Sequence, residues 1–412
     1  MPSKPGKYEM PWNLALWQHT TYKTKGEENM ENISRYAQLC PIIYGIGSAS
    51  LLGEEVKKLG CSKVLVVSDE NVSKIEFYEK CKKSLLDAGI ELVEFDEVLP
   101  DPPDYIVNRG GEIARTEKIG AIVAIGGGSV MDAAKAINIL INNPPPINQY
   151  FGNPAYKPGV PVVMVVTTAG TGSESTIVAV ITDTANGVKN SVLGAATLGI
   201  LDPEATVTLT SEDTAHTGMD ALAHAAEAIT AKLPNPKSEL LASDAIKKIM
   251  KYLPMAFEDG TNMEARGNLL LASNFAGIAF NDALVHLGHA IAHSIGAKFH
   301  VTHGEACALA LPEVMKYAAE IDASKVKVVG EAMGISFVGN ESSEEIGEIV
   351  AEAIRKFSKS MKIKSLKQLG ISKEDLLNTA DMIFKDPCYL FVPRELDREE
   401  VIKILENMYE NY

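Results

Sequence analysis

The chain has 412 residues, 46% of them hydrophobic and 23% charged, which is the composition of an ordinary globular protein with room for two cores. Its formal net charge of -15 excludes nucleic acid as an expected partner, since phosphate backbones are also negative. Five scattered cysteines without a CxxC pair indicate neither a disulfide framework nor a thiolate zinc site, so we expect a reducing, cytoplasmic protein. We expect no signal peptide and no membrane span.

Residues 1–35 are polar, contain several prolines and have little hydrophobic periodicity. We therefore predict an N-terminal extension that lies outside the two domains. Two tryptophans, Trp12 and Trp17, stand in this segment. They belong either to a surface tail or to a contact between subunits, and the sequence leaves both alternatives open.

Short apolar runs alternate with helical patterns between residues 36 and 211, as in βα units built on a mainly parallel sheet. The clearest predicted strands are KVLVVS at 63–68, AIVAIG at 121–126, and the apolar start of 161–174. Each runs into polar or glycine residues at the carboxyl edge of the sheet, where ligands usually bind. The segment 36–211 is therefore predicted to be an α/β dinucleotide-binding domain.

Residues 212–412 lack β-branched runs and contain amphipathic helical patterns rich in alanine, leucine, lysine and glutamate. This change of pattern predicts a second, all-α domain. The loops PDPPD at 100–104 and NNPPP at 142–146 separate elements of the first domain.

A glycine-rich loop, Gly126 to Ser129, directly follows a predicted strand and opens a helical pattern. Glycines let the backbone turn tightly and approach an anion, and the free amides at a helix start favour negative charge. The loop is thus a candidate phosphate site, although its spacing is not GxGxxG and a tight turn without ligand is the alternative. The loop at 167–174, TTAGTGSE, could hold a pyrophosphate or nicotinamide amide, or be a threonine-rich turn.

The carboxylate of Asp69 follows the strand at 63–68. At that edge it can accept hydrogen bonds from both ribose hydroxyls of an adenosine and would repel a 2'-phosphate, which favours NAD(H) over NADP(H). The alternative is that Asp69 only caps a helix at 69–72.

Histidines and one aspartate form a candidate metal site in the second half of the chain. Asp220 and His224 are four residues apart on a helical pattern, so both project from one face. His289 and His293 have the same spacing, and His303 follows a short loop. Nitrogen and oxygen donors without thiolate suit Fe(II), Zn(II), Mn(II), Co(II) or Ni(II), which act as Lewis acids toward a carbonyl or an alkoxide.

Four motifs together, GGGSVMDAAKA, TTAGTGSE, GMDALAHAAEA and GHAIAHSIGAKFHVTHG, resemble the iron-dependent (group III) alcohol dehydrogenase family in order and approximate spacing. The resemblance extends from about residue 38 to the C-terminus. It implies a dehydroquinate synthase-like architecture, a nicotinamide cofactor in the cleft between the domains, Fe(II) as the expected ion, and a homodimer or larger homo-oligomer.

The resemblance also assigns individual residues. It implies metal ligands at Asp220, His224, His289 and His303; cofactor contacts at Asp69, Gly127, Gly128, Ser129, Thr168, Thr171, Lys189 and Leu209; a substrate pocket at Phe280 and Cys388; and His293 beside the substrate, as the catalytic group that relays the proton.

Three features depart from the family pattern. The segment 189–203 is shorter than usual and, apart from the Pro203 that ends it, lacks its customary proline, which bears on Lys189. His286 is an additional histidine that could perturb the pocket or be a rival ligand. The tail reads CYLFVPREL, where the family commonly has an asparagine before the proline and arginine, so pocket polarity near Cys388 differs.

We therefore predict a metal-dependent alcohol dehydrogenase or aldehyde reductase that exchanges hydride between NAD(H) and a small aliphatic alcohol or aldehyde. Two enzymatic alternatives share the architecture: a zinc-dependent polyol dehydrogenase of the glycerol type, and a dehydroquinate-synthase-like lyase. The lyase needs basic residues for an anionic substrate, and the segment from Asp282 to Val301 contains only Lys298. A non-catalytic assembly protein would be expected to have lost at least one ligand.

Overall fold

The computed structural model describes residues 36–412, so the prediction for Trp12 and Trp17 lies outside the described residues. A parallel sheet forms the first half, with the strand order β1-β8-β5-β4-β2-β3. Its strands are β1 Ile42–Tyr44, β2 Lys63–Val67, β3 Glu91–Phe95, β4 Ala121–Gly126, β5 Val162–Val166 and β8 Leu198–Leu201. The three strands predicted from apolar runs are β2, β4 and β5.

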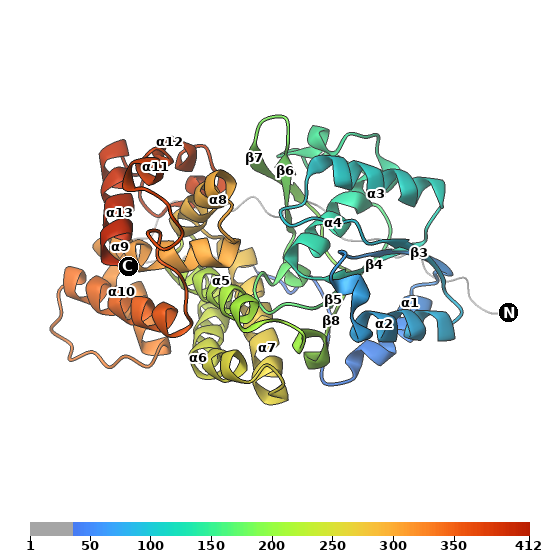
Figure 1. The fold of residues 1–412 in the computed structure, drawn as a ribbon, viewed down its shortest axis with the longest axis horizontal. Helices are drawn as coiled ribbons and strands as arrows, with labels where there is room; N and C mark the ends of the chain where they lie inside the picture. The colour runs from blue at the N-terminus through green and yellow to red at the C-terminus, as the bar shows by residue number, and fades with distance from the viewer. Residues whose placement is uncertain (1–35) are drawn as a thin grey trace, which may run out of the picture. The chain divides into compact units, whose positions relative to one another are not determined.

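Helices cover both faces of this sheet (Figure 1). Side chains of β2, β4 and β5 alternate between two hydrophobic clusters, because neighbouring residues of a strand point to opposite faces. One cluster includes residues of α1 (Leu52–Lys58) and α2 (Glu76–Asp87), and the other includes residues of α3 (Asp104–Thr116) and α4 (Gly128–Asn142). Burial on both faces explains why these strands are continuous apolar runs.

An antiparallel hairpin of β6 (Val178–Asp183) and β7 (Val188–Leu193) stands apart from the main sheet. It packs against α4 and contacts α8 of the helical half. Short 3-10 helices complete this half and the C-terminal tail: η2 Ser48–Leu51, η3 Val72–Lys74, η4 Ile147–Tyr150, η5 Ser173–Ser175, η6 Pro203–Thr206 and η7 Pro387–Phe391.

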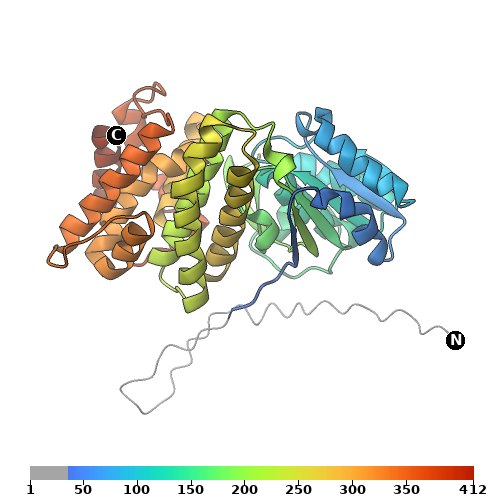
Figure 2. The same cartoon turned by 90° about the horizontal axis from the view of Figure 1, so that it is seen from below.

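The second half is helical, with α5, α6 and α7 packed side by side (Figure 2). Its helices are α5 Ser211–Thr230, α6 Pro236–Glu258, α7 Met263–Ala283, α8 Leu287–Phe299, α9 His303–Ala332, α10 Ser343–Ser360, α11 Lys373–Leu377, α12 Ala380–Ile383 and α13 Arg398–Asn411. The structure thus has the predicted fold class, an α/β half followed by an all-α half.

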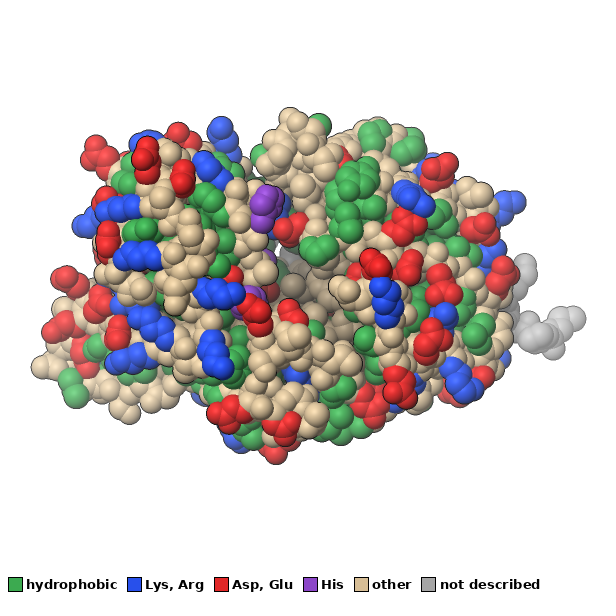
Figure 3. Space-filling view, in the orientation of Figure 1, with side chains coloured by type: hydrophobic (Ala, Val, Ile, Leu, Met, Phe, Trp, Pro, Cys, Tyr) green, Lys and Arg blue, Asp and Glu red, His purple; other side chains and the backbone are tan. Residues whose placement is uncertain are grey.

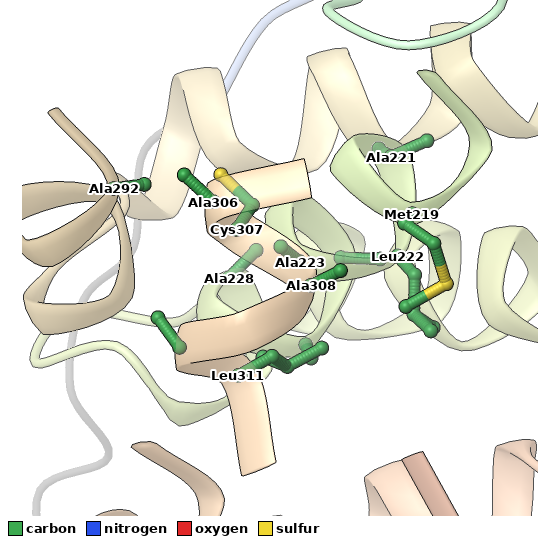
Figure 4. Packing of buried hydrophobic residues seen from close by; sticks show 14 of the residues in the cluster. Met219, Ala221, Leu222, Ala223, Ala228, Ala292, Ala306, Cys307, Ala308 and Leu311 are labelled. Atoms are coloured by element: carbon green, nitrogen blue, oxygen red, sulfur yellow. The ribbon is translucent and has the colours of Figure 1, made fainter. Parts of the chain in front are cut away.

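Small side chains let α5 and α9 approach closely. Alanines of both helices, with Cys307 and Leu311, fill the interface (Figure 4). At Gly304 a Cβ atom would lie 2.0 Å from the backbone oxygen of His216, so only glycine fits there. This contact places the first turn of α9 beside the middle of α5.

Within residues 36–412, no single helix is long and apolar enough to cross a membrane. Helices α7 and α8 reach that length and apolar content only when they are taken together, and the chain bends by 109° between them. Most residues of both helices are buried in the helical half.

Candidate metal and cofactor site

Four predicted ligands converge on one point in the helical half. Asp220 and His224 project from α5, His289 lies on α8, and His303 is the first residue of α9. One ligand atom from each lies within 4.8 Å of those of the other three. From Asp220 Oδ1 the distances are 3.7 Å to His224 Nδ1, 4.0 Å to His289 Nε2 and 3.4 Å to His303 Nε2.

The protonation states at this point suit a cation. Burial raises the pKa of Asp220 to about 6, and burial lowers the pKa of His224 and His303 well below the usual range. Both imidazoles are therefore neutral, the form that coordinates metals. Among the described residues, Asp220 Oδ1, His224 Nδ1 and His289 Nε2 are buried without a hydrogen-bond partner. Buried polar atoms are normally paired, so the donor set fits a metal ion between them.

Glu227 supports this group and was not predicted. Its Oε1 atom lies 2.7 Å from His289 Nδ1, while Oε2 accepts hydrogen bonds from the backbone amides of His286 and Gly288. Burial alone would raise the pKa of Glu227, but the neighbouring histidines and these hydrogen bonds lower it to about 2. An ionised Glu227 fixes the His289 tautomer whose Nε2 faces Asp220, as in carboxylate–histidine–metal arrangements.

His286, the extra histidine of this sequence, lies outside the group of four. Its ring is fully buried, and Nε2 lies 3.0 Å from the hydroxyl oxygen of Thr230. Its Nδ1 atom lies 3.5 Å from Glu227. The interpretation of His286 as a rival ligand is therefore not supported, because its ring nitrogens face Thr230 and Glu227 and are not part of the group of four.

A second group of side chains adjoins the first. His293 Nδ1 lies 2.9 Å from Asp386 Oδ2, and the His293 ring stacks on His303 with 5.2 Å between centroids. Asp386 Oδ1 also accepts from the backbone amide of Cys388 at 2.9 Å. Burial would raise the pKa of Asp386, but the adjacent His293 lowers it below the usual range. The sequence analysis singled out His293 and Cys388 and missed Asp386.

Phe280 lies on α7 and stacks on His224, with 4.3 Å between ring centroids and 14° between planes. The two predicted pocket residues, Phe280 and Cys388, therefore both adjoin histidines of the site, the first through His224 and the second beside His293. All five cysteines are free.

The predicted pyrophosphate loop lies at the start of α4, packed against the loop after β5. A Cβ atom at Gly127 would lie 3.0 Å from the Thr168 side chain, and one at Gly128 would lie 2.5 Å from Thr171 Cγ2. The first amides of a helix have no intrahelical acceptor, so they are available to an anion. Gly127, Gly128, Thr168 and Thr171 are all partly exposed. Any larger residue at position 128 would require Thr171 to move.

Asp69 follows β2, and its Oδ1 atom accepts hydrogen bonds from the amides of Asn71 and Val72 at 2.9 and 3.0 Å. These bonds hold the turn that leads into η3, whose N-cap is Asn71, so the helix at 69–72 that Asp69 was predicted to cap as the alternative is not present. The carboxylate is partly exposed beside the same edge of the sheet as the glycine-rich loop.

The remaining predicted cofactor residues occupy separate elements. Lys189 lies on β7, and its Nζ atom pairs with Asp101 at 2.7 Å. Ser129 Oγ accepts from the backbone amide of Asp101 at 3.2 Å, so Asp101 links the hairpin to the glycine loop. Leu209, just before α5, is partly buried, and its carbonyl oxygen accepts from Arg266 at 3.3 Å.

The two halves of the molecule leave a hollow between them in which histidine side chains are visible (Figure 3). The β6–β7 hairpin lies at this boundary, because β7 contacts α8. Burial raises the pKa of Asp220 and lowers the pKa of His303, and the positive charge of Lys189 on that hairpin opposes the first effect and adds to the second. The predicted cofactor and metal residues are therefore in electrostatic reach of each other.

Comparison with known proteins agrees with this architecture. A model of the family described as iron-containing alcohol dehydrogenase matches residues 41–203, and one described as Fe-containing alcohol dehydrogenase family, C-terminal, matches residues 214–409. The chain therefore belongs to the iron-containing alcohol dehydrogenase family, as its motifs predicted. Members of this family use NAD(H) and a divalent metal, usually iron.

Individual relatives cover most of the chain. It is 35% identical to an NAD-dependent methanol dehydrogenase of Bacillus methanolicus, over 89% of this chain and 97% of that protein. It is also 35% identical to a 1,3-propanediol dehydrogenase of Citrobacter freundii, over 89% and 96%. A crystal structure of a 1,3-propanediol oxidoreductase superposes with a TM-score of 0.87 at 34% identity, covering 91% of this chain and all of that one.

These relationships make the protein an oxidoreductase that acts on alcohols or aldehydes. They favour the dehydrogenase over the lyase that shares its architecture. The site itself speaks against a non-catalytic assembly protein, since every predicted ligand is present and the four meet at one point.

Proposed function

We propose that the protein is an NAD(H)-dependent alcohol dehydrogenase, or aldehyde reductase, with one Fe(II) ion held by Asp220, His224, His289 and His303. One observation carries this proposal: three of these residues direct buried, unpaired polar atoms toward a common point, within 4.8 Å of one another and of the fourth. The single ion would supply Lewis acidity toward an alcohol or carbonyl oxygen.

Residues around this point are the proposed substrate contacts and proton carrier. Phe280 covers one face of His224 and presents an apolar wall, which favours small aliphatic substrates over anionic ones. His293, oriented by Asp386, is the proposed proton carrier, because it adjoins the metal ligands and is partly exposed. Cys388 lies next to this pair and would contact the substrate.

The cofactor would lie along the carboxyl edge of the sheet. The amides at Gly127, Gly128 and Ser129 would bind the pyrophosphate, with Thr168 and Thr171 opposite them. Asp69 would accept hydrogen bonds from the adenosine ribose, which is why NAD(H) is proposed over NADP(H). Lys189 and Leu209 are proposed contacts of the nicotinamide ribose and the adenine.

A cytoplasmic homodimer or larger homo-oligomer is the proposed working form of the enzyme. The reducing compartment is supported by five free cysteines and no disulfide.

An anaerobic assay tests the function. Protein stripped of metal is reloaded separately with Fe(II), Zn(II) or Mn(II), and NADH oxidation is followed with a series of short aldehydes and with glycerol-derived substrates. We expect the highest turnover with Fe(II) and a simple aldehyde. Preference for Zn(II) together with a polyol substrate would instead support the polyol dehydrogenase. No NADH oxidation with any metal and substrate would contradict both.

The role of His293 is tested by His293→Ala, with turnover measured as a function of pH. Unchanged turnover and an unchanged pH profile would show that His293 does not carry the proton. Asp220→Ala should lose the metal itself, which elemental analysis of the purified variant reports independently of activity.

A further inference from the structure

A second cluster of metal-binding side chains lies next to the four-ligand site. His293, Asp386 and Cys388 each place one ligand atom within 4.8 Å of those of the other two. We propose that these three residues form a second metal site, which takes one thiophilic divalent cation such as Zn2+ with its fourth position open.

The local structure brings these donors together before any ion binds. Asp386 caps η7 by accepting a hydrogen bond from the amide of Cys388 at 2.9 Å, so the two side chains emerge from the same turn. η7 contacts α8, which carries His293, and the Asp386 carboxylate already lies 2.9 Å from His293 Nδ1. The site is thus preorganised by one capping turn and one helix contact.

The distances suit a tetrahedral zinc ion. Zinc binds sulfur at about 2.3 Å and nitrogen or oxygen at about 2.0 to 2.2 Å, so two donors of one ion are about 3.3 to 3.8 Å apart. The donors here lie within 4.8 Å of each other. Side-chain movements of roughly 1 Å would therefore bring them to the separation that zinc requires. The three side chains are partly exposed, which leaves a path for the ion.

The donor set distinguishes this cluster from the first site. The four-ligand site has three imidazoles and one carboxylate and therefore leaves a bound divalent ion with a net positive charge. The second cluster offers an imidazole, a carboxylate and a thiolate, so its two negative charges neutralise a divalent cation once the thiol has released its proton. Thiolate and imidazole together select zinc over magnesium or calcium.

Occupation of this site has a consequence for catalysis that rests on the proposed role of His293. A cation bound to the His293 ring replaces its hydrogen bond with Asp386 and prevents it from carrying a proton. Excess zinc should then inhibit enzyme whose first site already holds Fe(II). Metal counting, by contrast, does not depend on any catalytic role and tests the site by itself.

The experiment uses Co(II) as a spectroscopic substitute for zinc. Co(II) bound to a thiolate gives a charge-transfer band in the near ultraviolet, and none of the four ligands of the first site is a thiolate. We expect this band in the wild-type protein and its absence in Cys388→Ser. Cys307→Ser is the matched control, because Cys307 Sγ lies 3.7 Å from His303 Nε2, beside the first site. Cys307→Ser should keep the band.

Zinc content gives the second measurement. After equilibration with excess zinc and removal of free ion, wild type and Cys307→Ser should retain about two ions per chain and Cys388→Ser about one, as one three-residue site is lost.

Asp220→Ala should lose the first ion and keep the thiolate band, which separates failure of this proposal from failure of the proposed function. Asp386→Asn keeps the thiol and should weaken zinc binding at the second site at least tenfold, since even outer-shell changes cost about 10- to 100-fold. A single zinc per wild-type chain, or a band that follows Cys307 instead of Cys388, would overturn the proposal.

Discussion

The Nδ1 atom of His289 lies 2.7 Å from Oε1 of Glu227, and both side chains are buried. The opposite ring nitrogen, Nε2, faces Asp220 at 4.0 Å. Because Glu227 is ionised at any pH above about 2, it holds the proton of His289 on Nδ1 and leaves Nε2 free as a ligand. Glu227 contacts no proposed cofactor or substrate, and it thereby orients the His289 ring for metal binding.

Glu227→Gln should therefore weaken metal binding by about 10- to 100-fold, because a neutral amide neither stabilises the Nδ1 proton nor accepts two backbone hydrogen bonds as well. The measurement is the metal dissociation constant from competition with a chelator. Glu212→Gln is the control, since Glu212 is exposed and pairs only with Lys364 among the described residues. Gly288→Ala should have the same effect, because its Cβ atom would lie 2.4 Å from Glu227 Oε1. Wild-type affinity in both variants would show that Glu227 does not orient His289.

Cofactor preference should depend on the charge of Asp69. Asp69→Ser keeps a side chain that can cap the amides of Asn71 and Val72, but removes the carboxylate that would repel a 2'-phosphate. We expect the ratio of kcat/KM with NADPH to kcat/KM with NADH to rise at least about tenfold, or 1.4 kcal/mol. Glu70→Gln removes the neighbouring exposed carboxylate and should leave the ratio unchanged. An equal change in both variants would indicate a general effect of surface charge instead of a ribose contact.

Regular hydrophobic patterns made most of the fold predictable. β2, β4 and β5 are buried on both faces, so their apolar runs are unbroken, and the helices after Ser211 carry regular amphipathic patterns. The four proposed ligands were also recognisable, because Asp220 and His224 share a helix face at a spacing of four. Glu227 lies three residues after His224, and that spacing on the same helix could have indicated its role.

Other relationships arise only from the tertiary fold. Asp386 and His293 are 93 residues apart in the sequence, and Asp101 and Lys189 are 88 apart. No local periodicity connects such pairs, since they depend on how loops close over the helices and the sheet. For the same reason the sequence left His286 undecided until the structure placed its ring against Thr230.

The close contact between Gly128 and Thr171 gives a third prediction. In Gly128→Ala the new Cβ atom would meet Thr171 Cγ2 at 2.5 Å, so one of the two loops must shift and the amides of α4 lose their arrangement. We expect NADH binding, measured by its fluorescence, to weaken at least about tenfold, or 1.4 kcal/mol. The double variant Gly128→Ala/Thr171→Ser lacks the clashing methyl group and should recover much of the affinity. Failure to recover would mean that the Cβ atom blocks the cofactor directly.

A buried lysine connects the same two loops. Lys135 on α4 is 1% exposed, and its Nζ atom donates to the Ser173 hydroxyl at 2.8 Å, to the Thr176 hydroxyl at 3.1 Å and to the Val178 carbonyl at 2.8 Å. Ser173 in turn donates to Asp132 at 2.6 Å. Burial lowers the pKa of Lys135 from 10.5 to about 8. The ammonium group thus donates to three neutral acceptors, and the Asp132 carboxylate lies 3.9 Å away. The cost of desolvation outweighs the attraction of this carboxylate, so the pKa is lowered.

This lowered pKa predicts how stability changes with pH. Between about pH 8 and pH 10.5 the unfolded chain keeps the Lys135 proton while the folded chain releases it, so the free energy of unfolding rises with pH. From about pH 8 to about pH 9.5 this group should add roughly 1.5 kcal/mol. Lys135→Met lacks the titrating group, so the stability of wild type relative to this variant should increase by that amount. Urea unfolding at both pH values measures the difference, and Lys83→Met controls for loss of an exposed positive charge. If the free energy of unfolding of wild type relative to Lys135→Met stays constant or falls as the pH rises, Lys135 does not have a lowered pKa in the folded protein. The buried ammonium group would then not be what joins α4 to the loop after β5.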